Sequence, residues 1–260
     1  MENRKQILFI VLAAIFLTNA ILAELIGVKI FSMESTLGLT PANINILDYT
    51  LDFNLTAGVM IWPVVFITTD IINEYFGKKG VKKISFIAIG CISYAFLMIF
   101  LVTKLSPADF WMDVNNADDE GNYFNMNFAF NKIYTQGLGI IVGSIIAFLI
   151  GQLLDVIVFQ KLRKVTGEKM IWLRATGSTL ISQLIDSFVV LAIAFYILAP
   201  SESRWDFSQV LSVGSINYIY KFMIAILLTP LIYLGHYFID QYLGKEKAEK
   251  IKSEAADSSF

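Results

Sequence analysis

The sequence predicts an all-α polytopic membrane protein with six transmembrane helices and both termini in the cytoplasm. Hydrophobic residues make up 56% of the 260 residues and charged residues only 16%, whereas soluble domains have about 45–50% and about 25%. The mean hydropathy is +0.64. The apolar residues gather in continuous runs, each close to the roughly 20 residues that a helix needs to cross a bilayer. Lys and Arg gather on alternate connections between these runs.

The first apolar run follows a basic start and resembles a signal peptide in that respect. Its apolar part, from Ile7 to Ala23, is longer than the about 7–15 residues of a signal peptide core, and no small-residue cleavage motif follows. We therefore expect a retained first span. The runs are continuous rather than alternating, which argues against a β-barrel. The predicted spans are residues 7–30, 56–76, 84–103, 134–159, 177–199 and 209–238.

The basic residues predict the orientation, because Lys and Arg favour cytoplasmic connections. The segment 31–55 contains neither residue and is expected outside. The basic clusters are expected inside and lie near residues 4–5, 78–83, 161–174 and 245–252.

Two segments lie outside the predicted bundle. Residues 1–244 are expected to form one transmembrane transporter domain, and residues 245–260 form a charged cytoplasmic tail. The outer segment 104–133 is acidic and rich in asparagine. It is interpreted either as a solvated loop or, through its aromatic residues, as part of an outer lid.

Composition argues against several functional classes. The net charge of −2 is too small to favour nucleic acid as a partner. One cysteine and one histidine leave little capacity for a disulfide or a metal cluster, and no cofactor is expected. The chain has no G-x-S-x-G motif and no Walker A motif. An intramembrane hydrolase stays the least favoured alternative, because none of the aspartates within the spans follows Gly-x-Gly.

Polar side chains recur within the predicted spans, where an ionisable group is costly unless it faces water or a partner. Glu24 and Glu74 are interpreted as gate or anchor residues. Several structural explanations stay open: amides can join helices, and Glu74 or Asp155 can pair with basic residues at the cytoplasmic end. The predicted substrate-binding residues are Asn19, Asp70, Asn73, Gln152, Asp155, Gln183, Asp186, Asn217 and Lys221.

The pattern Gln-x-x-Asp occurs twice within these spans, at Gln152/Asp155 and at Gln183/Asp186. Residues three apart share one face of a helix, so each pair presents an amide and a carboxylate together. We expect both pairs to line one cavity. Polar groups that converge from several helices, without catalytic geometry, favour a binding site for a polar solute and hence transport.

Lys221 lies near the middle of the last predicted span. Its side chain is too short to reach either interface, so it needs a carboxylate partner within the bundle. We expect that partner to be Asp186 or Asp155. A structural ion pair between Lys221 and Asp186 is the alternative to a role in transport.

Four segments resemble the queuosine-precursor transporters, which are also called the vitamin uptake transporter family. They occur in the same order on the same frame, and the resemblance extends over roughly residues 10–240. The segments are "TDIINEYFGKK" (69–79), "IIAFLIGQLLDVIVFQKL" (145–162), "STLISQLIDSFVV" (178–190) and "YKFMIAILLTPLIYL" (220–234).

This resemblance implies an inner-membrane importer of 7-deazaguanine bases, in nitrile or aminomethyl form, for tRNA modification. A carboxylate would accept the ring N–H and the exocyclic amine of such a base, amides would bind its other polar atoms, and aromatic side chains would stack on it. The implied partners are a purine-like small molecule and the lipid bilayer. A substrate-binding subunit that depends on a separate ATPase is the alternative. A homodimer and a coupling ion stay open.

Overall fold

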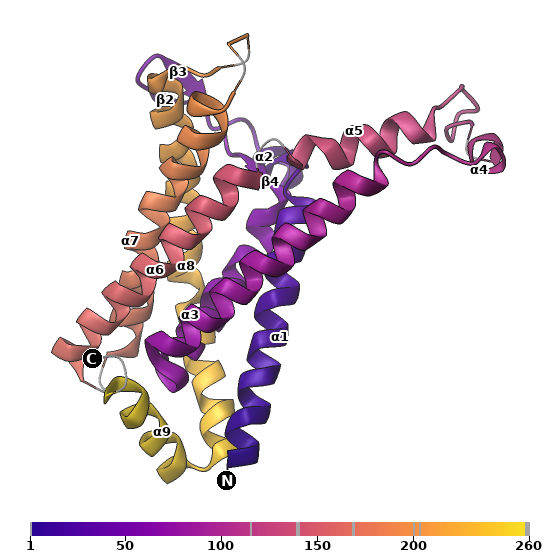
Figure 1. Ribbon diagram of the computed structural model, residues 1–260. Coiled ribbons are helices and arrows are strands. Elements are labelled where there is room, and N and C mark those ends of the chain that lie inside the picture. The colour runs from indigo at the N-terminus through magenta and orange to yellow at the C-terminus, as the bar shows by residue number, and fades with distance from the viewer. Residues whose placement is uncertain are drawn as a thin grey trace.

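The computed structural model describes residues 2–114, 116–138, 141–167, 170–199, 201–202 and 204–257, which form a bundle of long helices (Figure 1). The multi-pass helical class is confirmed, because five helices within those ranges are long and apolar enough to cross a membrane. These helices are α1 (Glu2–Ile26), α3 (Trp62–Val102), α6 (Ile141–Thr166), α7 (Ile171–Leu191, continued by a π-helix over Ala192–Ile197) and α8 (Phe207–Leu243).

Helix α3 is interrupted at Gly77, between the second and third predicted spans. Gly77 has φ 63° and ψ −170°, a conformation that is nearly restricted to glycine. A Cβ atom built on Gly80 would lie 3.5 Å from Cγ2 of Ile72, although eight residues of a continuous helix span about 12 Å. The chain therefore folds back at Gly77. The predicted connection of several residues is absent, because the chain is helical again from Lys78.

We expect Gly77→Ala to lower the free energy of unfolding by about 1–3 kcal/mol, because a Cβ atom is strained in this backbone conformation. The thermal unfolding midpoint of the purified protein in detergent measures the effect. Gly90→Ala is the matched control, since Gly90 lies on the same helix and a Cβ atom there would meet open space. Equal midpoints for the two variants would contradict the prediction.

Four short strands at one end of the bundle depart from the purely helical prediction. The chain leaves α1 at Ile26, earlier than expected, and soon forms β1 (Ile30–Ser32), which pairs antiparallel with β4 (Asn54–Thr56). A short helix α2 (Met33–Thr36) follows β1, and a 3-10 turn (Ala57–Met60) leads from β4 into α3. The other pair, β2 and β3, spans Ile44–Ile46 and Tyr49–Leu51.

Two side-chain contacts fasten these strands to the start of α8. The Tyr49 hydroxyl donates to the Asp206 carboxylate at 2.6 Å, and the Ser212 hydroxyl donates to the Ile46 carbonyl at 3.0 Å. Asp206 also accepts from the backbone N–H of Gln209 and so caps α8. The hydrogen bond from Tyr49 holds the pKa of Asp206 below its usual range. The strands therefore lie over one end of α8 (Figure 1).

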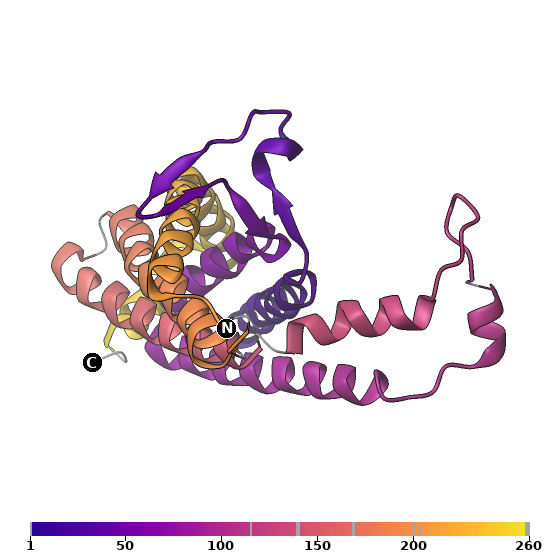
Figure 2. The same cartoon turned by 90° about the horizontal axis from the view of Figure 1, so that it is seen from above.

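The outer segment 104–133 belongs to an arm that projects sideways from the bundle (Figure 2). The arm contains α4 (Asp109–Val114) and α5 (Met126–Leu138). The fourth predicted span was placed too early, because residues 134–138 are part of α5, residues 139–140 are outside the described ranges, and the spanning helix begins at Ile141. Helix α4, which holds two of the candidate lid aromatics, lies at the tip of the arm and away from the bundle (Figure 1).

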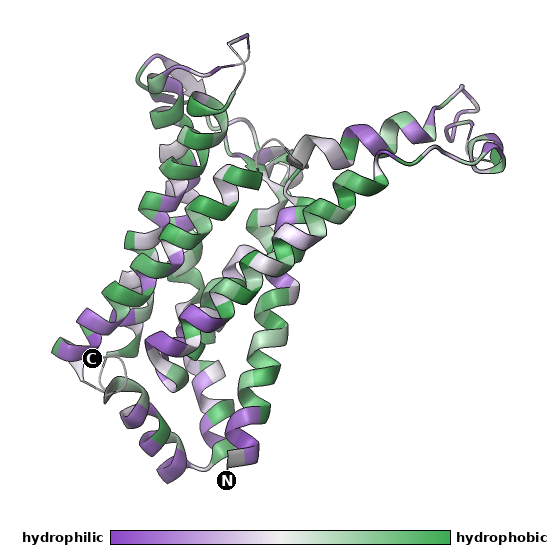
Figure 3. Cartoon of the chain, in the orientation of Figure 1, coloured by the Kyte–Doolittle hydropathy of each residue, from purple (hydrophilic) through white to green (hydrophobic). Residues whose placement is uncertain are grey.

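The opposite end of the bundle carries both termini and the charged helix α9 (Lys245–Asp257) (Figure 1). Hydrophilic residues are concentrated there and on the arm, whereas the helices between are mainly apolar (Figure 3). Helix α9 packs against the bundle: Ala248 is fully buried, and Lys252 pairs with Asp240 of α8 at 2.9 Å. The predicted charged tail is thus helical as far as Asp257, and residues 258–260 are outside the described ranges.

Candidate functional site

A stacked aromatic pair lies between helices at the centre of the candidate site. Trp62 and Phe66 are one helical turn apart on α3, and their ring centroids are 5.8 Å apart at an interplanar angle of 16°. Both rings, together with Thr179 of α7, line two neighbouring cavities. The aromatic pair therefore presents flat apolar surface to both spaces.

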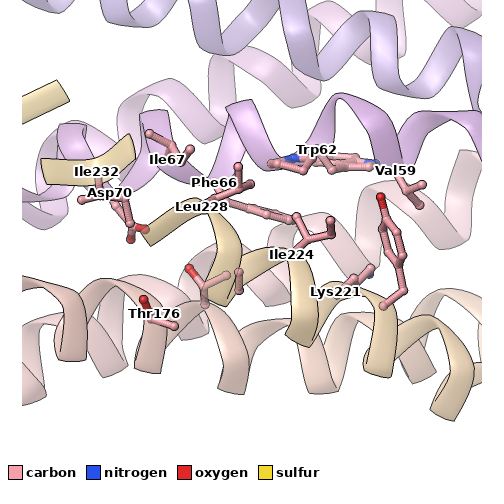
Figure 4. A pocket seen from close by; sticks show the side chains of 14 residues that line it. Val59, Trp62, Phe66, Ile67, Asp70, Thr176, Lys221, Ile224, Leu228 and Ile232 are labelled. Atoms are coloured by element: carbon pink, nitrogen blue, oxygen red, sulfur yellow. The ribbon is translucent and has the colours of Figure 1, made fainter. Parts of the chain in front are cut away.

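The larger cavity lies between α3, α7 and α8 and is mainly apolar. Ile224 and Leu228 of α8 face Ile67 of α3 across it (Figure 4). The ionisable residues that line it are Asp70 at one end and Lys221 toward the other (Figure 4). An apolar space with a few charged groups is typical of a site for a small, mainly flat ligand.

The smaller cavity lies between α3, α6 and α7, and both Gln-x-x-Asp pairs line it. Gln152 and Asp155 come from α6, while Gln183 and Asp186 come from α7. The prediction that the two pairs line one cavity is confirmed. This happens because α6 and α7 pack closely, with Gly151 leaving room for Asp186: a Cβ atom on Gly151 would lie 3.7 Å from that of Asp186.

Lys221 pairs with Asp186, which was one of its two predicted partners. Its Nζ atom lies 2.6 Å from Oδ2 of Asp186, and the side chains are 16% and 22% exposed. The ion pair joins α8 to α7 and places one charged contact between the two cavities, since Lys221 lines the larger and Asp186 the smaller.

Glu74 forms the most buried ion pair of the bundle. Arg174 of α7 donates to both of its carboxylate oxygens, at 2.6 and 3.2 Å, and the two side chains are 1% and 2% exposed. Arg163 of α6 lies 3.6 Å from the same carboxylate and donates to the Glu74 backbone carbonyl at 3.2 Å. The break at Gly77 leaves such carbonyls without helical partners, so Arg163 replaces one lost helical bond. Glu74 thus pairs with basic residues, which was one of the structural explanations left open by the sequence.

Asp70 and Asp155 differ from Glu74 and Asp186 because, within the described part of the chain, no basic side chain forms an ion pair with either. They are 3% and 6% exposed. Asp155 accepts from the hydroxyls of Thr179 and Ser182 at 3.5 and 3.4 Å. Thr179 and Asp70 line the larger cavity together. The pairing of Asp155 with cytoplasmic basic residues, the alternative considered above, does not occur among these residues.

Several buried polar atoms around the cavities have no hydrogen-bond partner among the described residues. They are Oδ1 of Asp70, Oδ2 of Asp155, and Oε1 of both Gln152 and Gln183. Buried polar atoms are nearly always satisfied in folded proteins, and each exception needs an explanation. These four acceptors all belong to residues that line a cavity, as expected for a site that binds a ligand with several donors.

Other predicted site residues lie away from both cavities. Asn19 bonds to the Ile15 carbonyl of its own helix at 2.7 Å. Asn73 accepts from Gln160 at 2.7 Å and so joins α3 to α6, which is a structural role for an amide. Glu24 accepts from Ser144 of α6. Asn217 is half-buried on α8 and lines neither cavity.

Among the lining residues that sequence reasoning did not select are Trp62, Phe66, Thr179 and Ser182. Trp62 and Phe66 precede Asp70 at helical intervals of four, so the three share one face of α3. Thr179 and Ser182 precede Gln183 and Asp186 by four residues in the same way. This spacing was the available signal, because it places aromatic rings and hydroxyls beside polar groups that had already been identified.

The region of the chain that builds both cavities matches one protein family. The family model described as "Putative vitamin uptake transporter" matches residues 56–235. The residues that line the cavities, from Val59 to Ile232, all fall within this range. No solved structure gives a significant match to the chain.

Three curated relatives are similar to most of the chain. The "Probable queuosine precursor transporter" of Bacillus subtilis (strain 168) is 27% identical over 195 residues, which are 74% of this chain and 77% of that protein. A protein of the same description from Haemophilus influenzae is 29% identical over 68% of this chain and 66% of its own length. The "Queuosine precursor transporter" of Escherichia coli (strain K12) is 26% identical over 68% of this chain and 70% of its own length.

Proposed function

The chain belongs to the vitamin uptake transporter family, and from this membership we propose that it imports a queuosine precursor, a 7-deazaguanine base in nitrile or aminomethyl form. The relatives are transporters rather than enzymes, and this chain is likewise a multi-pass transporter of the cell inner membrane. The observation that supports the proposed substrate is that the buried amide oxygens of Gln152 and Gln183 have no partner among the described residues and lie in a cavity that the two stacked rings also line. A 7-deazaguanine supplies both the donors and the flat ring that such a site accommodates.

We propose six spans with both termini in the cytoplasm, as the sequence predicts. The fold-back at Gly77 supports this number, because it divides α3 into two helical segments. The basic residues near Gly77, between α6 and α7, and on α9 support a cytoplasmic location of that end. The strands and the arm then lie on the outer side.

The base is proposed to bind between Trp62 and Phe66 on one side and α6 and α7 on the other. Stacking on an aromatic ring contributes about 1–3 kcal/mol per base. Asp186 accepts the ring N–H and the exocyclic amine, while Gln152 and Gln183 bind the remaining polar atoms. The contact with Lys221 leaves Asp186 able to accept further hydrogen bonds from the base, since each carboxylate oxygen can accept two.

The proposed function is tested by uptake of a labelled precursor into a bacterial host that lacks both its own synthesis of the base and its own transporter. We expect accumulation when this chain is expressed alone. Accumulation without a partner ATPase would also exclude the alternative of a substrate-binding subunit. If the host accumulates no label although the chain is present in its membrane, the proposed function is wrong.

Gln183→Leu tests the proposed binding residues in the same assay. Leucine keeps the approximate size but removes the amide, so we expect substrate affinity to fall by about tenfold to a hundredfold, or about 1–3 kcal/mol. Stability should not fall, because the amide oxygen of Gln183 has no partner to lose. Gln241→Leu, at an exposed position of α8, is the matched control. Unchanged affinity in Gln183→Leu would remove Gln183 from the proposed site.

A further inference from the structure

We propose that uptake is coupled to protons and that Asp70 and Asp155 form the proton-binding site, in which one proton is shared between the two carboxylates. This inference rests on the proposed import function and adds the coupling ion to it. The site lies on three helices, since Asp70 belongs to α3, Asp155 to α6 and the intervening Thr179 to α7.

Burial is the first support for this site. Asp70 and Asp155 are 3% and 6% exposed, and one oxygen of each has no hydrogen-bond partner among the residues that the structure describes. An ionised carboxylate in such surroundings is strongly disfavoured. Two of them, close enough to repel each other, cannot both remain ionised at low cost.

The neighbouring basic residues are already engaged with other carboxylates. Arg163 and Arg174 hold Glu74, which lies one helical turn from Asp70 on α3. In the described part of the chain, no salt bridge joins a basic residue to Asp70 or Asp155. The most economical way to neutralise the Asp70–Asp155 pair is therefore to bind a proton.

The remaining charged groups near the pair do not provide a cation either. Lys221 of α8 pairs with Asp186 of α7 at 2.6 Å. Glu24 of α1 accepts from Ser144 and adds a further carboxylate near Asp186. These groups surround the pair with more carboxylates than basic side chains can balance locally, which favours uptake of a positive ion.

Thr179 has the geometry to connect the two carboxylates through one proton. Its hydroxyl has one hydrogen to donate and lone pairs to accept; it donates to Asp155 at 3.5 Å and lines the larger cavity together with Asp70. When both carboxylates are ionised, the hydroxyl can donate to only one of them. When Asp70 is protonated, it donates to the Thr179 oxygen, and Thr179 donates to Asp155. A single proton thus satisfies the whole chain of three groups.

The position of the pair connects proton binding to substrate binding. Asp70 lines the larger cavity, Asp155 lines the smaller cavity, and Thr179 lines both. Asp155 lies one helical turn from Gln152, a proposed substrate contact. A proton that enters from the outer side with the base would neutralise the pair while the base is bound, and it would leave to the cytoplasm when the site opens inward. No other chemical change is required.

The test uses the purified full chain in proteoliposomes whose membrane potential is clamped, with labelled nitrile-form base, which is uncharged. For the wild type, an inward gradient of about one pH unit should drive accumulation up to about tenfold per transported proton. Addition of the base without a gradient should acidify the lumen, as measured by an enclosed pH-sensitive dye. Exchange of labelled for unlabelled base measures transport that needs no net proton movement.

Asp70→Asn should lose the gradient-driven accumulation but keep exchange, because the amide is neutral at every pH. Asp48→Asn, at an exposed position of the segment 31–55, is the control and should behave as the wild type. If Asp70→Asn accumulates base as the wild type does, Asp70 is not part of the proton site. Should that variant fail to fold, the wild-type dye signal decides the question of coupling by itself.

The outcomes separate this inference from the proposed function. Exchange without gradient-driven accumulation, and without acidification of the lumen, would overturn proton coupling and leave the importer intact. The absence of both exchange and accumulation in the wild type would overturn the proposed function, and the proton site with it.

Discussion

Arg174→Met is expected to reduce the stability of the protein more than any other single change considered. The substitution leaves the Glu74 carboxylate buried without its two closest hydrogen bonds. Removal of one partner from a buried ion pair typically costs about 3–5 kcal/mol, which is a large part of the about 5–15 kcal/mol that stabilises a folded domain. Arg163 compensates only in part, because it lies 3.6 Å from the carboxylate.

The unfolding midpoint in detergent and the abundance in the membrane measure this loss. Lys5→Met is the matched control, since Lys5 forms an exposed ion pair with Glu254 and such pairs contribute about 0–1 kcal/mol. The double variant Glu74→Leu/Arg174→Met should recover part of the stability, because no charge is then left unpaired. A midpoint for Arg174→Met equal to that of Lys5→Met would mean that the buried pair does not stabilise the bundle.

Lys221→Met is expected to fold and to transport poorly. Methionine is similar in length but uncharged, so Asp186 loses the contact at 2.6 Å that holds its carboxylate oriented between α7 and α8. We expect the uptake rate to fall about tenfold or more, which corresponds to about 1.4 kcal/mol or more. The measurement is initial uptake of labelled precursor, normalised to the amount of protein in the membrane.

The recovery of the double variant distinguishes this role from a purely structural one. Lys221→Met/Asp186→Asn should fold better than Lys221→Met, because the second change removes the stranded charge, and part of the uptake should return. Wild-type uptake by Lys221→Met would identify Lys221 as an accommodated structural residue and would refute a role in transport.

The helical frame and part of the site were predictable from the sequence because both depend on local spacing. Apolar runs predict spans, and the two Gln-x-x-Asp pairs predict polar helix faces. The pairing of Lys221 with Asp186 follows from the cost of a lysine in the bilayer. Each of these inferences uses only the residue types within one helix, or within two helices adjacent in sequence, and the low dielectric around them.

The features that were not predicted depend on contacts between distant segments. Strands β1 and β4 form by pairing residues more than twenty positions apart, such as Ile30 with Thr56. The docking of α9 depends on Arg163, which donates to the Lys252 carbonyl at 2.7 Å. The four-residue spacing of Trp62, Phe66 and Asp70 places both rings on the same helix face as the carboxylate. That the rings border both cavities follows only from the packing of α6, α7 and α8 against this face.

The position of Glu74 has a consequence for the order in which the ribosome delivers the chain to the membrane. Glu74 is synthesised about ninety residues before Arg163 and a hundred before Arg174. An isolated carboxylate at bilayer depth is costly, so the early hairpin around Gly77 is expected to wait with Glu74 at the membrane surface. Glu74 would enter the bilayer only after α6 and α7 have been inserted, because these helices carry its partners Arg163 and Arg174. Insertion of the hairpin around Gly77 can thus begin early, while packing of the bundle around Glu74 must await the synthesis of α6 and α7.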